Sequence, residues 1–98
     1  MYRKALDLDG RAVDAANGLG VLLVEAKRPA EAVQWFARAV EGSPSFVEAR
    51  LNLGIALEQS GQPQRAADAY RAVLAADGNY PREKSAARAL LTRLGAAR

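Results

Sequence analysis

The sequence repeats itself every 34 residues, and this period limits the chain to a small set of folds. When the chain is shifted by one period, residues of the same kind coincide along most of its length. The coinciding pairs are Leu19-Gly20 with Leu53-Gly54, Leu23 with Leu57, Pro29 with Pro63, Ala32 with Ala66, and Phe36 with Tyr70. A unit of this length is too short to bury its own apolar face, so it must stack on a neighbour. The period therefore indicates a stack of small units that presents a surface to a partner.

Glycine and proline divide the chain into six segments with apolar residues at helical spacing. Pro29 and Pro63 suit the first turn of a helix, and Gly61 suits the end of one. Ser45 with Glu48 predicts a capping box before the fourth segment. Helices are expected over residues 2–8, 12–26, 29–41, 46 to about 60, 63 to about 76, and 80 or 81 to 94. Because the connections are short, consecutive helices should be antiparallel neighbours.

The composition argues against catalysis. Among the 98 residues there is neither histidine nor cysteine, so the commonest general bases and nucleophiles are missing. Glycine-rich phosphate loops and metal-ligand motifs are also absent from the sequence. We therefore expect no enzymatic activity, no cofactor and no metal site. The formal net charge of +3 is mildly basic and does not by itself identify a polyanionic partner.

The sequence gives no sign of a membrane segment. No apolar run approaches the roughly 18 residues that a spanning helix needs. The opening residues 1–4 lead into an amphipathic stretch that lacks the apolar core of a signal peptide. This pattern favours the cytoplasm but leaves the compartment open, and the abundance of alanine and arginine is typical of a bacterial protein.

The repeated positions closely resemble the tetratricopeptide repeat, a 34-residue helix–turn–helix unit. Residues 13–46 supply Leu19, Gly20, Leu23, Ala32, Phe36, Ala39 and Pro44 of its pattern. Residues 47–80 supply Leu53, Gly54, Leu57, Ala66, Tyr70 and Val73, with Gly78 replacing the closing proline. Residues 1–10 match the second helix of a truncated unit, with Tyr2, Ala5 and Gly10 in register, and residues 81–98 form a C-terminal capping helix. The resemblance implies a single all-α domain over residues 1–98, an α-solenoid in which antiparallel helix pairs form a right-handed superhelix. It would hold about two and a half units plus the cap.

Two departures from the family pattern carry expectations of their own. Lys27 stands where the second unit has Gly61, so it is expected to adopt a left-handed backbone conformation that disfavours a side chain. Arg88 stands where the earlier units have a glycine at the helix crossing. We therefore expect that no partner helix follows the last helix and that its basic residues face outward: Arg82, Lys84, Arg88 and Arg93.

The resemblance also implies a function, which is protein–protein interaction. The family binds an extended peptide or a helix of a partner in a concave groove lined by the first helices of successive units. Carried over to this chain, the groove residues are Asn17, Val21, Val24, Glu48, Leu51, Asn52, Ile55, Arg82 and Ser85, flanked by Asp14, Glu25, Glu58, Ala89 and Thr92. Asn52 occupies the position where many members hold a peptide backbone through an amide. The apolar members of the set are interpreted either as a semi-exposed groove floor or as buried packing.

Two alternatives to groove binding stay open. The segment over residues 1–10 still presents Leu6 and Leu8, so the chain could be a self-association module in a homo-oligomer. Nucleic-acid binding through Arg82, Lys84, Arg88, Arg93 and Arg98 is disfavoured, because no stacking aromatics are interleaved with them. The leading prediction is a non-catalytic scaffold that belongs to a larger protein or assembly. Trp35 is expected to be half-buried or, alternatively, to anchor a partner.

Overall fold

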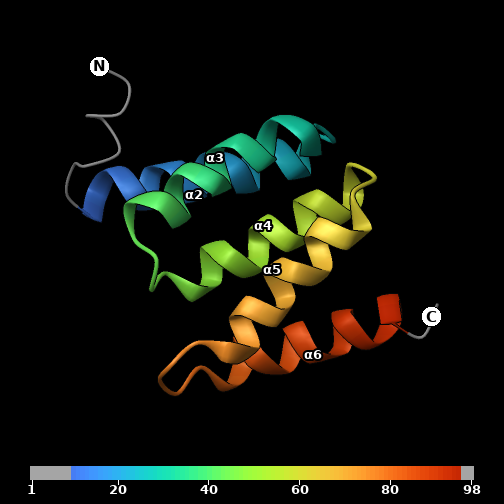
Figure 1. Ribbon diagram of the computed structural model, residues 1–98. Helices are drawn as coiled ribbons and strands as arrows, with labels where there is room; N and C mark the ends of the chain where they lie inside the picture. Colours follow the sequence, from blue (N-terminus) through green and yellow to red (C-terminus); the bar gives the residue numbers. More distant parts are fainter. Residues whose placement is uncertain (1–9, 96–98) are drawn as a thin grey trace.

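The computed structural model describes residues 10–95, and over that range the chain is helical with short connections (Figure 1). The helices are α2 (Gly10–Glu25), α3 (Pro29–Gly42), α4 (Val47–Gln59), α5 (Pro63–Ala75) and α6 (Pro81–Gly95). These bounds agree with the expected segments to within about two residues. The helix α2 begins at Gly10, two residues before the expected start at residue 12. The helix expected over residues 2–8 lies outside the described residues.

The start of α4 differs from the expected capping box. Phe46, not Ser45, is the N-cap residue, and no side chain caps the helix. The reason lies in packing, because Phe46 is partly buried against the core cluster of Val13, Ala16, Ala39 and Ala49. The side chain of Arg50 also fixes the loop, since its Nη2 donates a hydrogen bond of 2.8 Å to the carbonyl oxygen of Pro44.

The turns within the two units have the same geometry despite different residue types. Lys27 adopts φ = 67° and Gly61 adopts φ = 85°, so the left-handed conformation expected of Lys27 is confirmed. In both turns the following residue donates its N–H to a carbonyl five positions earlier, from Arg28 to Leu23 and from Gln62 to Leu57. The repeat therefore imposes the turn even where a lysine must take the glycine conformation.

Glycine allows the two helices of each unit to pack closely. The ring of Phe36 lies over Gly20, and a Cβ atom at that position would overlap with it. One period later, a Cβ at Gly54 would lie 2.5 Å from Cε1 of Tyr70. Both aromatic side chains are almost fully buried, at 1% and 0% exposure. The repeated glycine–aromatic pair is thus a direct contact between the first and second helix of a unit.

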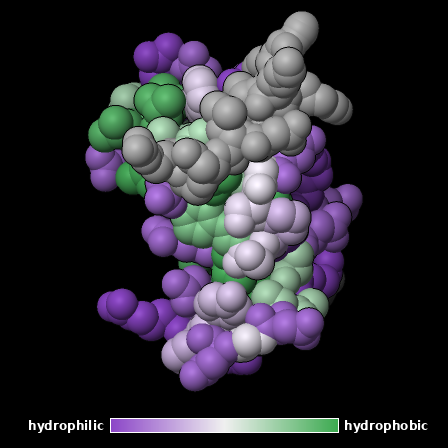
Figure 2. Space-filling view, turned by 90° about the vertical axis from the view of Figure 1, so that its left-hand side faces the viewer, coloured by the Kyte–Doolittle hydropathy of each residue, from purple (hydrophilic) through white to green (hydrophobic). Residues whose placement is uncertain are grey.

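The helices form a curved stack in which the inner and outer rows differ. Each helix packs against the next one along the chain, and α4 also contacts both α2 and α6. Between α3 and α5 no comparable contact occurs within residues 10–95. The first helices α2, α4 and α6 therefore make up the inner row, and the second helices diverge on the outside. In Figure 2, which views the left side of Figure 1, hydrophobic residues gather at the upper left and along the middle, with hydrophilic residues around them.

One face of α2 is uncovered by the described part of the chain. Leu19 and Leu22 are 41% and 61% exposed. One period later, Leu53 and Ala56 lie in the apolar cluster that includes Phe36 of α3. The difference arises because α3 covers this face of α4, whereas none of residues 10–95 covers the same face of α2.

Candidate functional site

The first helices meet α3 around an open hollow of about 190 Å³ on the inner row. Its walls bring together four of the expected groove residues, the expected flanking residue Glu25, and Phe36. The lining residues are Val21, Val24 and Glu25 from α2, Phe36 from α3, and Asn52 and Ile55 from α4. The 34-residue period places these helices side by side, so residues far apart in the sequence share one surface.

The apolar walls are neither fully buried nor fully exposed. Val21, Val24 and Ile55 are partly buried, and the buried ring of Phe36 closes the bottom of the hollow. Such a surface can receive an aliphatic side chain without rearrangement of the fold. Leu51 differs from the others, because it packs against the main core cluster and does not line the hollow. The contribution of Phe36 was not foreseen, since its repeat position indicated packing alone.

An asparagine pair gives the hollow a polar side. Nδ2 of Asn52 donates a hydrogen bond of 3.1 Å to Oδ1 of Asn17 across the α2–α4 interface. Asn17 is only 9% exposed, so it acts as a support for the more accessible Asn52. This hydrogen bond fixes the orientation of the Asn52 side-chain amide. Its carbonyl oxygen can then accept a hydrogen bond from a backbone N–H of a partner.

The remaining expected groove residues lie outside the hollow. Glu48 is exposed in the first turn of α4, one helical turn before Asn52. Arg82 and Ser85 are exposed on α6, which contacts α4 but not the hollow itself. The structure therefore concentrates the aliphatic and amide members of the expected set at the α2–α4 junction and spreads the charged members along the inner row.

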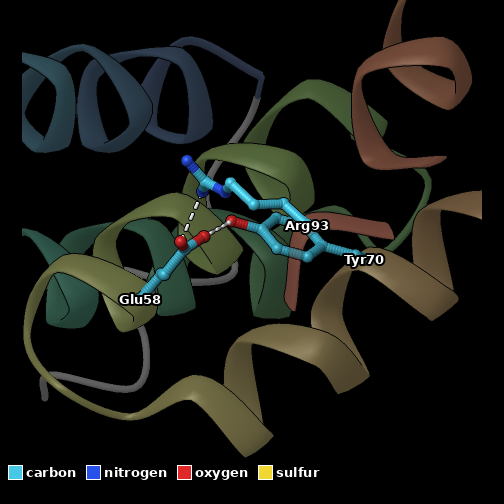
Figure 3. Close-up of polar contacts among 3 residues, drawn as sticks. All are labelled: Glu58, Tyr70 and Arg93. Atoms are coloured by element: carbon cyan, nitrogen blue, oxygen red, sulfur yellow. Dashed lines mark hydrogen bonds and ion pairs between the residues drawn. The ribbon is translucent and has the colours of Figure 1, made fainter. Parts of the chain in front are cut away.

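One period further along, a polar network replaces the hollow (Figure 3). Glu58 and Tyr70 occupy the positions that Val24 and Phe36 hold in the first unit. The hydroxyl of Tyr70 donates a hydrogen bond of 2.8 Å to Oε1 of Glu58, and Arg93 of α6 pairs with Oε2 of the same carboxylate. Burial, reinforced by the hydrogen bond to Glu58, raises the pKa of the Tyr70 hydroxyl above its ordinary value. The network joins α4, α5 and α6.

The basic residues of α6 do not form one outward face. Lys84 is partly buried, and its Nζ donates hydrogen bonds to the carbonyl oxygens of Ala76 at 2.7 Å and Gly78 at 3.4 Å. The expectation that Lys84 faces outward is therefore wrong, because the open end of α5 and the following turn provide acceptors. Arg93 is committed to Glu58, whereas Arg82 and Arg88 are exposed. Arg98 lies outside the described residues.

Trp35 lies on the outer row, away from the hollow. It is partly buried, and the guanidinium of Arg38 lies 4.6 Å from the centre of its ring. This position agrees with the half-buried interpretation, since an arginine stacked on an indole covers part of its surface.

Two further features bear on the kind of site. No helix within residues 10–95 combines the length and apolar character needed to cross a bilayer. The same part of the chain contains no group of three or more acidic, histidine or cysteine side chains arranged to hold a metal ion.

Comparison with known proteins gives the class to which this architecture belongs. The sequence pattern of the tetratricopeptide repeat matches residues 23–94, and the chain therefore belongs to the tetratricopeptide repeat family. Repeats of this family generally mediate protein–protein interaction.

The chain is also similar to the probable UDP-N-acetylglucosamine–peptide N-acetylglucosaminyltransferase SPINDLY of Hordeum vulgare. The two are 32% identical over 95 residues, which is 97% of this chain but 10% of that protein. The chain thus spans about a tenth of the length of this relative, and the similarity does not carry the enzymatic activity of the whole protein with it.

Proposed function

We propose that the chain is a non-catalytic interaction scaffold that binds an extended segment of a partner protein along α2, α4 and α6. The observation that supports this most directly is the hollow between α2 and α4. It combines partly exposed aliphatic walls with the Asn52 amide that Asn17 orients. An aliphatic side chain of the partner enters the hollow, and its backbone N–H donates to Oδ1 of Asn52.

The size of the surface limits the strength of binding. Residues 10–95 contribute three helices to the inner row, so a segment bound along this part of the chain makes few contacts. Affinity also depends on how rigidly the site is held, and not on buried area alone. The hydrogen bond between Asn17 and Asn52 provides such rigidity, because it fixes an acceptor before the partner arrives.

Selection from a library of random dodecapeptides, with the full chain as target, tests this proposal. Asn52→Ala removes the acceptor, and Gln34→Ala is the matched control on an exposed position of α3. We expect selected peptides to bind Asn52→Ala about fivefold more weakly, the effect of losing about 1 kcal/mol from one hydrogen bond. Binding to Gln34→Ala should be unchanged. Calorimetric titration gives the affinities, and circular dichroism verifies that both variants are folded. If peptides bind all three proteins equally well, the groove assignment is wrong.

Self-association is a second candidate, because Leu19 and Leu22 are exposed on α2 and no residue in 10–95 covers them. A second copy of the chain that covers this face would make the protein a dimer. Light scattering after size-exclusion chromatography, over a wide concentration range, tests this possibility. A dimer that Leu22→Glu converts to a monomer would support it, and a monomer at every concentration would exclude it. The residues Leu6 and Leu8, which first suggested this function, lie outside the described part of the chain.

A further inference from the structure

The charges along the inner row change sign from one end to the other. The helices α2, α4 and α6 run in the same direction (Figure 1), so residues one period apart form rows across them. Two such rows border the groove positions, one on the N-terminal side and one on the C-terminal side. The first row is Asp14, Glu48 and Arg82, and the second row is Glu25, Gln59 and Arg93. Both begin with a carboxylate on α2 and end with a guanidinium on α6.

The acidic end of these rows is available to a partner. Asp14, Glu25 and Glu48 are exposed, and none of them forms an ion pair with another described side chain within residues 12–95. At the other end, Arg93 is already paired with Glu58, so the exposed Arg82 is the cation that a partner would meet. The rows therefore present uncompensated negative charge at α2 and α4 and positive charge at α6.

The acidic end also coincides with the apolar hollow. Glu25 lines the hollow directly after Val24, and Glu48 lies one turn before Asn52 on the same face of α4. A basic residue next to the side chain in the hollow would reach one of these carboxylates. An acidic residue in its place would face like charge from both helices, which disfavours binding.

We infer that the groove is directional and selects an extended segment with a defined order of charges. The segment carries an aliphatic residue for the hollow, a lysine or arginine beside it, and an aspartate or glutamate further along, towards Arg82. This inference rests on the proposed groove function and specifies the partner that the groove accepts. The charge order fixes which way the segment runs, a property that the aliphatic walls alone do not supply.

The test repeats the dodecapeptide selection with the full chain, Glu25→Lys and Glu41→Lys. Glu41 is an exposed glutamate on the outer helix α3, so its reversal makes the same charge change away from the groove. We expect peptides selected by the wild type and by Glu41→Lys to share a basic residue within two positions of an aliphatic one. Glu25→Lys should lose that preference. For a selected peptide, exchange of its basic and acidic residues should weaken binding to the wild type by about threefold or more. The difference should decrease in 0.5 M salt, which screens exposed charges.

The outcomes separate this inference from the function on which it rests. If charge-exchanged peptides bind equally well, or if Glu25→Lys and Glu41→Lys select the same sequences, the directional groove is rejected. Groove binding itself still stands in that case, provided that the same peptides lose affinity for Asn52→Ala. If no peptide is enriched above a selection without protein, the proposed function and the inference are both rejected.

Discussion

Lys27 shows how a single residue can oppose the backbone conformation that the fold requires. The turn between α2 and α3 holds it at φ = 67°, where the Cβ atom of an L-residue approaches the following carbonyl oxygen. The equivalent turn of the second unit has Gly61 at φ = 85°, which avoids this contact. The domain therefore retains a local strain in the first unit that the second unit lacks.

Lys27→Gly is expected to stabilise the domain by about 1 kcal/mol, because glycine relieves this strain. Gly61→Lys is the reciprocal change and should destabilise by a similar amount, since no neighbouring atom blocks the side chain itself. Urea unfolding followed by circular dichroism measures both effects. A fall in stability for Lys27→Gly would mean that the greater freedom of glycine in the unfolded chain outweighs the strain.

At the scale of the elements, Glu58 connects three helices through its two carboxylate oxygens. One oxygen accepts the hydroxyl of Tyr70 on α5, and the other pairs with Arg93 on α6. In the first unit, where Val24 and Phe36 take the positions of Glu58 and Tyr70, this connection is missing. The polar network therefore distinguishes the attachment of α6 from the packing of the earlier helices.

Tyr70→Phe tests this network through its dependence on pH. Burial, with the hydrogen bond to Glu58, raises the pKa of the Tyr70 hydroxyl, so the folded state keeps a proton that the unfolded chain loses above about pH 10. The contribution is complete below that pH, and it decreases as the pH rises towards the folded-state pKa. The wild type should thus lose up to about 1.4 kcal/mol of stability per pH unit in this range relative to Tyr70→Phe. At pH 7 the variant should be about 1 kcal/mol less stable. Urea titrations from pH 7 to 11 measure both effects, and a difference in stability between wild type and variant that does not change with pH would contradict the buried hydroxyl.

Element boundaries were predictable because local chemistry sets most of them. Pro29 and Pro63 open α3 and α5, and the turn at Gly61 ends the α4 segment, as expected. The start of α4 was not predictable in this way, because the tertiary packing of Phe46 overrides the local capping signal of Ser45. The position of Lys84 was missed for a related reason. Its carbonyl acceptors belong to the end of α5 and the next turn, which only the folded arrangement brings near.

At the scale of the whole molecule, equivalent positions in the two units differ in whether another helix covers them. Leu22 and Ala56 are one period apart, yet the first is 61% exposed and the second fully buried. The cluster that buries Ala56 contains Ala32 and Phe36 of α3. Position in the stack, and not residue type, therefore decides whether this face forms part of the core.

The pair Leu22→Asp and Ala56→Asp should separate these environments. We expect Leu22→Asp to change stability by less than about 0.5 kcal/mol, as is usual for exposed positions. Ala56→Asp places an unpaired carboxylate in the core and should cost about 3 kcal/mol or more. Thermal unfolding of both variants, monitored by circular dichroism, provides the comparison. Equal losses would mean that the face of α2 is covered in solution.

The candidate site could be predicted in part, since the repeat register alone placed Val21, Val24, Asn52 and Ile55 on one face. The register could not show how residues from neighbouring helices complete the site. The ring of Phe36 forms the bottom of the hollow because α3 crosses behind α2, a contact between helices that no spacing within one helix encodes. The support of Asn52 by Asn17 depends in the same way on the distance between α2 and α4.

The lack of packing between α3 and α5 has a mechanical consequence. Successive units are joined mainly by the packing of α3 on α4 and of α5 on α6, whereas α3 and α5 do not meet within residues 10–95, so the stack can bend about a hinge line between units. Flexing would change the separation of the outer helices without breaking a packed interface between them. A segment bound from α2 to α6 would span the hinge line and act as a brace. Ligand binding would then stiffen the whole stack, and a force that straightens the stack would weaken ligand binding.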